Sequence, residues 1–411
     1  MPAGAFGRLG RAFRSRDFRR FTVGSSISLI GLWMQRIAVG WVTWELTGSG
    51  VWLGVVAFAD LFPTVLVSPF SGVLADRFDR RRIALLTQGL AMSGSALLAL
   101  LSLGDNLSLS GLIVLTAFQG LVISFWQPAR MALLPDLVRP GDLATAVALN
   151  SVIFNAARFI GPALAGPLLV YAGPGWVFAV NALSYVAMLV ALAGIHPPRR
   201  PAGGTREGLL KAILTGYRYT LHHPGISVLL GLMITSSLCL RPVAELLPGF
   251  ADQVFQRGAD GLAALAGAIG VGAVAGGLWL AQRATVLGLT RWVLGSLLVL
   301  VLALVGFVLT GRFILALVCL AVAGGAMVIA GAGTQTLVQQ AVSPDKRGRV
   351  MALFGMVFRG APALGALWLG GLSEWLGLSL ALAVGCGLAG GVGCWAWRRR
   401  RALQQVLEVE F

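Results

Sequence analysis

The chain has 411 residues, of which 57% are hydrophobic and only 12% are charged, and its mean hydropathy is +0.83. Such a composition excludes an ordinary water-soluble globular protein and predicts a multi-span membrane protein. The net charge of +16 would suit a nucleic-acid-binding protein, but the basic residues are spread over alternate loops without interleaved aromatic residues. We therefore expect a lipid bilayer, and no nucleic acid, as the partner.

Apolar stretches of about 20 residues, the length of a membrane-spanning helix, follow one another along the chain. The short alternating segments of membrane barrels are absent from the sequence, so we predict an all-α integral membrane protein. Its twelve predicted transmembrane helices cover residues 22–44, 51–74, 83–103, 107–131, 143–171, 175–195, 225–247, 261–282, 290–310, 313–340, 348–373 and 377–397.

The polar stretch at 196–224, rich in Pro and Gly, divides these helices into two bundles, 22–195 and 225–397. Of the 32 Lys and Arg residues, 25 fall on one side of the predicted bilayer and two on the other. By the positive-inside rule, three segments are cytoplasmic. They are the basic segment 1–21, the linker 196–224 and the tail 398–411. We expect segment 1–21 to lie on anionic lipids of the inner leaflet as an uncleaved amphipathic helix.

Two charged residues lie inside the first two spans, where an ionisable group is costly and needs a partner or a function. Arg36 and Asp60 are each roughly 12–14 Å from the outer end of their span, at 1.5 Å per residue. We predict that Asp60 takes up and releases a driving proton, while Arg36 sets its pKa through contact and separation. The alternative is a permanent salt bridge that holds two helices together.

Other span residues are candidates for contact with the substrate. Arg158, with Asn155 one turn earlier, and Arg359 occupy equivalent places in the fifth and eleventh spans, where two guanidinium groups would favour an anionic or strongly hydrogen-bonding solute. Either arginine could instead bind carbonyls of its own bundle. Aromatic residues of the fourth span, Phe118 and Trp126, line an apolar cavity or belong to the interfacial belt.

The seventh span contains Arg241 and Glu245, four residues apart and hence predicted to share a helix face. Pro242 between them can bend the helix and free carbonyl groups. We predict a second ion-coupling or substrate contact there. The alternative is a self-neutralising pair near the outer end of the span.

The two halves contain similar short sequences at an offset of about 200 residues. Arg158 precedes G-P-A-L at 161–164, and Arg359 precedes A-P-A-L at 361–364. Between the second and third spans stands S-G-V-L-A-D-R-F-D-R-R-R, residues 71–82. This run resembles the loop G-x-L-a-D-r-x-G-r-k-r of the major facilitator superfamily, with Asp79 at the usual Gly position. The resemblance implies two pseudo-symmetric six-helix bundles around a central site.

Within that superfamily, D-F-R-R-F at 17–21, W-M-Q-R-I-A at 33–38 and W-E-L-T-G-S at 44–49 resemble the bacterial enterobactin-exporter and macrolide-efflux branch. Residues 161–166 partly resemble the fifth-helix G-P-x-x-G-G motif of antiporters. The resemblance implies outward, proton-driven transport of small amphipathic molecules such as drugs or siderophores. Gating is expected from the loop and its surroundings, namely Gly72, Asp76, Arg77, Arg80, Arg81, Arg130, Gly161 and Pro162, with Arg130 as partner of Asp76. A loop that merely follows the positive-inside rule is the alternative.

The sequence contains no G-x-x-x-x-G-K-[ST] loop, no His and Cys metal cluster and no nucleophile–base pair. We therefore expect neither an enzyme nor a cofactor or metal. The prediction is a proton-coupled exporter, an antiporter working by alternating access as a monomer in the bacterial inner membrane, with a small-molecule substrate and protons as partners. Uptake or facilitated transport by the same fold, and a non-transporting scaffold or receptor, are the alternatives.

Overall fold

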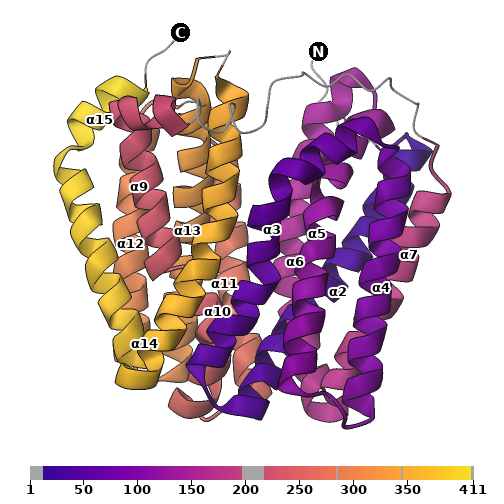
Figure 1. Cartoon of the computed structure of the whole chain (residues 1–411). Helices are drawn as coiled ribbons and strands as arrows, with labels where there is room; N and C mark the ends of the chain where they lie inside the picture. The colour runs from indigo at the N-terminus through magenta and orange to yellow at the C-terminus, as the bar shows by residue number, and fades with distance from the viewer. Residues whose placement is uncertain (1–12, 197–216, 284–285, 344–345, 409–411) are drawn as a thin grey trace. The chain divides into compact units, whose positions relative to one another are not determined.

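The computed structural model describes residues 13–196, 217–283, 286–343 and 346–408, except for the side chains of residues 68–77 and Pro140. Every element assigned in this part of the chain is helical (Figure 1), which confirms the all-α prediction. The helices of the first half are α2 (Arg16–Thr47), α3 (Gly50–Arg77), α4 (Arg80–Leu103), α5 (Leu109–Leu137), the 3-10 turn η1 (Pro140–Asp142), α6 (Leu143–Ala172) and α7 (Pro174–Ala193). Those of the second half are α9 (Pro224–Cys239), α10 (Val243–Gly249), the π-helical η2 (Phe250–Val254), α11 (Gly258–Ala281), α12 (Leu289–Leu309), α13 (Phe313–Ala341), α14 (Arg347–Arg398) and α15 (Arg400–Leu407).

Within the described residues, ten helical segments are long and apolar enough to cross a membrane. One of them, α14, contains both of the last two predicted spans and turns at Gly377, whose φ of 77° suits glycine. Helix α2, which covers the first predicted span, is not among the ten. Its hydropathy is lowered by polar side chains such as Ser25, Ser28 and Gln35, which are buried inside the protein.

The seventh predicted span is interrupted at Arg241 and Pro242. Helix α9 ends at Cys239 and α10 begins at Val243, because proline lacks an N–H and its ring blocks the preceding turn. The span predicted over 225–247 lies within the apolar segment Pro224–Val254, and the bend expected at Pro242 is a break between two helices. Arg241 lies in the turn and Glu245 in the first turn of α10, so the argument that they share one helix face does not hold.

The chain divides into two compact units. Unit 1 consists of residues 1–42 and 66–205, and unit 2 consists of residues 43–65 and 206–411. The units differ from the predicted bundles 22–195 and 225–397 at one place: the end of α2 and most of α3 belong to unit 2. The unit boundaries at 42/43 and 65/66 fall inside helices.

Unit 1 is packed around α2, α4, α5 and α7. Phe18 and Phe21 at the start of α2 are fully buried in a cluster with Leu133 of α5 and Leu192 of α7. Small residues let the helices approach closely, as is common between membrane helices. A Cβ atom at Gly24 would lie only 2.7 Å from the Cβ of Ala191, for example.

Unit 2 also depends on close helix crossings. A Cβ at Gly276 of α11 would lie 2.6 Å from the carbonyl oxygen of Gly325 in α13. The predicted tail begins as a docked helix: α15 contacts α9, α12 and α13 at one end of the unit (Figure 1), and Leu403 and Leu407 are buried. These contacts tie the C-terminal segment to the helical core of unit 2.

Candidate transport site

Trp33 of α2 is the meeting point of two arginines in unit 1. The guanidinium carbon of Arg36 lies 5.2 Å from the centroid of the indole ring, and that of Arg158 in α6 lies 5.5 Å from the same centroid. Both distances are in the range of cation–π attraction. Arg36, which was predicted to set the pKa of Asp60, therefore contacts the same ring as Arg158, which was predicted to bind substrate.

Helix α6 supplies two further parts of this cluster. Phe154 contacts Trp33 edge-on, with ring centroids 5.9 Å apart and an interplanar angle of 75°. Gly161 faces the backbone of α2, because a Cβ at this position would lie 2.5 Å from the Cβ of Trp33. The absence of a side chain at Gly161 thus lets α6 bring Arg158 close to Trp33; this packing role was not part of the predicted gating function.

A buried polar network begins at Gln35, the residue next to Arg36. Ser95 of α4 and Asn181 of α7 each donate to Gln35 Oε1 at 2.7 Å. Gln119 of α5 donates to Ser95 Oγ at 2.9 Å and to the carbonyl of Ala91 at 3.0 Å. The network joins four helices and fixes the orientation of α2. Sequence reasoning missed it, although Gln and Asn inside apolar spans are a usable signal.

Asp60 lies in α3, two residues after Phe58 and two before Phe62 in the sequence. The rings of these two phenylalanines stack on each other, with centroids 4.4 Å apart. The carboxyl residue is partly buried and takes part in an interaction of its own, as does Arg36. Asp60 belongs to unit 2 and Arg36 to unit 1. The predicted pairing of these two residues stays a prediction.

In unit 2, Arg241 binds the eleventh predicted span. Its guanidinium carbon lies 4.2 Å from the ring centroid of Phe358, and its Nη1 donates to the Phe358 carbonyl at 3.2 Å. Phe358 in turn stacks on Phe354, with ring centroids 5.9 Å apart. Glu245 is partly buried and also takes part in an interaction. The turn before α10 is thus anchored to α14 through an arginine on an aromatic ring.

Arg359 follows Phe358 in α14 and is partly buried. The structure gives it no hydrogen bond or ion pair to another residue of the described part of the chain. Arg158 and Arg359 belong to different units, so their predicted joint action on a substrate stays a prediction.

Three further predicted substrate contacts, Trp126, Phe118 and Asn155, make contacts within unit 1 and stay predictions. Trp126 is buried in the core cluster of unit 1, where it also lines a small pocket between α2, α4, α5 and α7. Phe118 is partly buried and packs against Ala91 and Tyr185. Asn155 donates to the carbonyl of Ser151 in its own helix at 2.8 Å, a local bond that a polar side chain in an apolar helix commonly makes.

The loop between α3 and α4 is held by unit 1 itself. Arg80 Nη1 lies 3.1 Å from Asp136 Oδ2, and Asp79 accepts from the backbone N–H of Arg81 at 2.9 Å, which caps α4. Arg81 donates to the carbonyls of Leu192 and Ala193 at the end of α7. Asp79, the departure from the family pattern, is therefore a helix cap. The side chains of Gly72, Asp76 and Arg77 lie outside the described residues.

Arg130 is almost fully buried in α5, with a relative exposure of 2%. Its Nη2 donates to Asn150 Oδ1 of α6 at 2.5 Å, whereas Nε and Nη1 have no hydrogen-bond partner among the described side chains. The side chain of Asp76, the partner predicted for Arg130, lies outside the described residues. A buried guanidinium group is costly to leave unpaired, so the pairing with Asp76 stays a prediction. Pro162, the remaining predicted gating residue, lies buried inside α6.

Sequence reasoning also missed a set of contacts in unit 2 around the turn between α2 and α3. Trp44 Nε1 donates to Asp252 Oδ2 of η2 at 2.9 Å, and Ser49 Oγ donates to Glu374 Oε2 of α14 at 3.0 Å. Gly50 packs against the backbone of α14, since its added Cβ would lie 3.5 Å from the carbonyl oxygen of Gly370. No local pattern links residues so far apart in the sequence.

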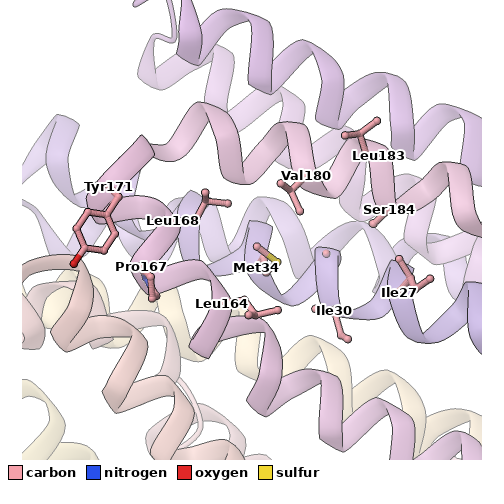
Figure 2. A pocket seen from close by; sticks show the side chains of 11 residues that line it. Ile27, Ile30, Met34, Leu164, Pro167, Leu168, Tyr171, Val180, Leu183 and Ser184 are labelled. Atoms are coloured by element: carbon pink, nitrogen blue, oxygen red, sulfur yellow. The ribbon is translucent and has the colours of Figure 1, made fainter.

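An apolar groove of about 670 Å³ lies in unit 1 between α2, α6 and α7 (Figure 2). Its polar side chains are those of Tyr171 and Ser184, and aliphatic residues such as Ile30 and Leu164 form the rest of the wall. None of the residues predicted to bind substrate lines this groove. Its wall is mostly apolar and contains no charged side chain, unlike the cluster at Trp33.

No group of three or more His, Cys, Asp or Glu side chains in the described part of the chain is arranged to hold a metal ion.

The sequence matches a profile of the transmembrane secretion effector family over residues 11–399. The chain is 27% identical to the staphyloferrin A transporter of Staphylococcus aureus, over 84% of this chain and 87% of that protein. It is 30% identical to the enterobactin exporter EntS of Escherichia coli O1:K1, over 92% of this chain and 89% of that protein.

Solved structures share the fold at low sequence identity. The nucleoside transporter NupG has a TM-score of 0.74 at 12% identity, covering 94% of this chain and 99% of its own. A bacterial homologue of the lysosomal transporter Spinster, in an inward-facing conformation, has a TM-score of 0.68 at 18% identity, covering 96% and 98%. Together with the family profile, the membrane spans and the helical fold, these likenesses establish that the chain belongs to the transmembrane secretion effector family of the major facilitator superfamily, whose members are membrane transporters rather than enzymes.

Proposed function

We propose that this secondary transporter is an exporter that exchanges protons for small amphipathic molecules, with siderophores as the first class to test. The observation that carries the coupling proposal is Asp60, a partly buried carboxyl residue in the apolar helix α3. An acid in such a position is costly unless it is paired, hydrated or protonated during a cycle. A proton-coupled carrier gives this acid a function.

The proposed cycle uses the sensitivity of a carboxyl group to its surroundings. Contact with a guanidinium group such as that of Arg36 favours the ionised form of Asp60, and separation in an apolar environment favours the protonated form. Alternating access changes these surroundings once in each direction. Proton uptake on one side of the membrane and release on the other would then drive substrate the opposite way.

The outward direction is supported by the relatives of the chain. EntS is an enterobactin exporter and covers nine-tenths of this sequence, and the staphyloferrin A transporter is a second siderophore carrier of similar length. Siderophores are small polar molecules with anionic metal-binding groups, so guanidinium groups suit them. Arg158 and Arg359 are the proposed substrate contacts in units 1 and 2, and Arg241 with Glu245 forms the proposed second coupling site.

The location and the gate follow from the basic residues. We place the chain in the bacterial inner membrane as a monomer with both termini in the cytoplasm, because Lys and Arg are concentrated in loops on one side. The ion pair of Arg80 with Asp136 and the binding of Arg81 to the end of α7 keep the 72–82 loop at the end of unit 1. From there Gly72, Asp76 and Arg77 are proposed to close the cytoplasmic side.

The test is siderophore and dye efflux from cells that express the wild type, Asp60→Asn or Asp60→Glu, with and without a protonophore. We expect efflux from wild-type cells to stop with the protonophore, and Asp60→Asn to lose about tenfold or more of the rate, since no proton can be exchanged at an amide. Asp60→Glu should retain part of the activity. The matched control is Asp105→Asn, an exposed loop acid with a positive φ that Asn tolerates.

Wild-type efflux that neither the protonophore nor Asp60→Asn changes would remove proton coupling from the proposal. Accumulation of the same compounds inside the cells would indicate uptake or facilitated transport. If the purified protein in liposomes moves none of the tested compounds in either direction, the scaffold or receptor alternative replaces the proposal.

A further inference from the structure

Arginine and tryptophan side chains pair at one end of unit 2. The guanidinium carbon of Arg283, just after α11, lies 5.6 Å from the ring centroid of Trp279 and 5.5 Å from that of Trp292 in α12. The two indole rings contact each other, with centroids 4.6 Å apart and an interplanar angle of 60°. Arg283 also donates from Nη2 to the carbonyl of Leu287 at 3.1 Å. Two rings and one hydrogen bond therefore hold this guanidinium group where α11 ends and α12 begins.

Two more pairs come from the junction of α14 and α15. The guanidinium carbon of Arg399 lies 4.6 Å from the ring centroid of Trp395, and that of Arg400 lies 5.1 Å from the ring centroid of Trp397. Trp397 in turn faces α12, since a Cβ added at Gly295 would lie 3.6 Å from its ring. The arginines at the start of α15 are thus beside the first turns of α12.

The first turn of α12 adds a further arginine. Arg291 is exposed and lies four residues before Gly295, on the same face of the helix. Glu408, which follows α15, accepts from the backbone N–H groups of Gly288 and Thr290. Residues from α11, α12, α14 and α15 therefore meet at this one end of unit 2.

The basic side chains at this end are not neutralised by the protein itself. They are Arg283, Arg291, Arg398, Arg399, Arg400 and Arg401. None of the six forms an ion pair with an acidic residue of the described part of the chain. Glu408 already binds two backbone N–H groups with its two carboxylate oxygens. A surface with such an excess of positive charge attracts anions.

These pairs lie where the apolar helices end. Residues 378–398, which follow the turn at Gly377, are about one membrane span in length, so α15 begins at the surface of the hydrocarbon core. Tryptophan is typical of this level of the bilayer. Farther along α12, Val299 and Leu302 are exposed on the same face as Trp292, at intervals of seven and three residues. An anion held by the arginines therefore has an apolar surface beside it, along which hydrocarbon chains can lie.

These residues form one Arg–Trp cluster, which consists of Trp279, Arg283, Arg291, Trp292, Trp397 and Arg400. We propose that the Arg–Trp cluster binds the headgroup of an anionic phospholipid. The lipid phosphate accepts from the guanidinium N–H groups, while its acyl chains pack along the exposed apolar face of α12. The site thus requires a net negative charge and hydrocarbon chains in one molecule. The cluster contains none of the residues proposed for proton coupling or substrate contact, so the inference does not depend on the exported molecule.

The test is native mass spectrometry of the purified full-length chain in detergent, titrated with dioleoyl phosphatidylglycerol or with dioleoyl phosphatidylcholine. The two lipids have the same acyl chains and differ in net charge. We expect the wild type to bind phosphatidylglycerol about tenfold or more tightly than phosphatidylcholine. Arg283→Gln and Arg400→Gln should each weaken phosphatidylglycerol binding about fivefold and change phosphatidylcholine binding little. The matched control is Arg312→Gln, which removes the same charge at an exposed residue beyond the other end of α12.

Three results would overturn the inference. Equal binding of the two lipids would show that the cluster does not select a negative headgroup. Equal losses in Arg312→Gln and in the two cluster variants would show attraction by the overall charge, without a site. Displacement of phosphatidylglycerol by inorganic phosphate at the same concentration would indicate a site for free phosphate, in which the apolar face of α12 takes no part.

A second variant covers the case in which Arg283→Gln does not fold, as judged by size-exclusion chromatography. Arg291→Gln then replaces it, because the side chain of Arg291 is exposed and forms no hydrogen bond with another described residue. Wild-type affinity for phosphatidylglycerol in both Arg291→Gln and Arg400→Gln would overturn the inference as well.

Discussion

The indole N–H of Trp44 donates to the carboxylate of Asp252 at 2.9 Å, although 208 residues separate the two in the chain. Trp44 lies near the end of α2 and is 5% exposed, so the indole is almost fully enclosed, whereas Asp252 is exposed. Hydrogen bonds to charged groups contribute about 1.5–3 kcal/mol, more than those between neutral groups. The bond therefore ties the α2–α3 turn to η2 within unit 2.

Replacing Trp44 by Phe should lower the free energy of unfolding by about 1.5–3 kcal/mol, because Asp252 loses its donor and the pocket loses part of an indole. Unfolding by sodium dodecyl sulfate in mixed micelles measures this change. Trp52→Phe, at a tryptophan that is 39% exposed, is the control and should change stability little. Equal stability of Trp44→Phe and the wild type would show that the hydrogen bond contributes nothing.

The C-terminal segment should stabilise α12. Glu408 accepts from the backbone N–H groups of Gly288 at 2.7 Å and Thr290 at 2.8 Å, which otherwise have no partner at the start of that helix. Glu408→Ala is expected to cost about 0.5–2 kcal/mol, the usual value of a helix cap. Thermal unfolding in detergent tests this, with the exposed Gln405→Ala as control. A drop of the same size in both variants would contradict a capping role.

Acidification should weaken the start of α9. His223 caps this helix by accepting from the N–H of Ile226 at 3.3 Å, and only the neutral ring can accept. Burial lowers the pKa of His223 from its ordinary value, and a backbone hydrogen bond opposes this shift in part. The stabilisation is therefore complete above the unfolded pKa of about 6.5 and is lost as the pH falls through the lowered folded value.

The variant His223→Asn keeps a capping side chain but cannot titrate in this range. Its melting temperature, relative to the wild type, should rise as the pH is lowered from 7 to 5. His222→Asn, at an exposed neighbour, should follow the wild type. Parallel curves for His223→Asn and the wild type would rule out the cap as a source of pH dependence.

The buried polar network of unit 1 should respond strongly to truncation. Asn181→Ala removes one of the two donors to Gln35 Oε1 in the buried network, which costs about 1–2 kcal/mol in membrane helices. Mixed-micelle unfolding is again the measurement, and Asn106→Ala in an exposed turn is the control. Equal stability of Asn181→Ala and the wild type would show that the bond between Asn181 and Gln35 contributes nothing to the stability of unit 1.

Long apolar runs predicted the helices well, because lipid forces every backbone group to bond within its own segment. The prediction 290–310 corresponds to α12 at Leu289–Leu309, and 313–340 corresponds to α13 at Phe313–Ala341. The interruption at Pro242 was only partly foreseen, because a proline in a membrane helix either bends or breaks it depending on its neighbours.

The candidate site was predicted less completely. Arg36 and Arg158 stood out because charges in apolar spans are rare, but their shared contact with Trp33 depends on how α2 and α6 cross at Gly161. Trp126 and Phe118 stay predicted substrate contacts, because composition does not separate an aromatic ring that lines a cavity from one that fills a core. Gln35 and Asn181 were overlooked because they are 146 positions apart in the sequence.

The assignment of residues 43–65 to unit 2 bears on how the protein can be divided into fragments. A gene cut at the 197–216 linker would give a C-terminal fragment without these residues, so Asp252 would lose Trp44 and Glu374 would lose Ser49. Such a fragment carries exposed surfaces that only the N-terminal fragment can cover. The two fragments, when co-expressed, should therefore be recovered as a complex, because residues 43–65 of the N-terminal fragment pack into unit 2.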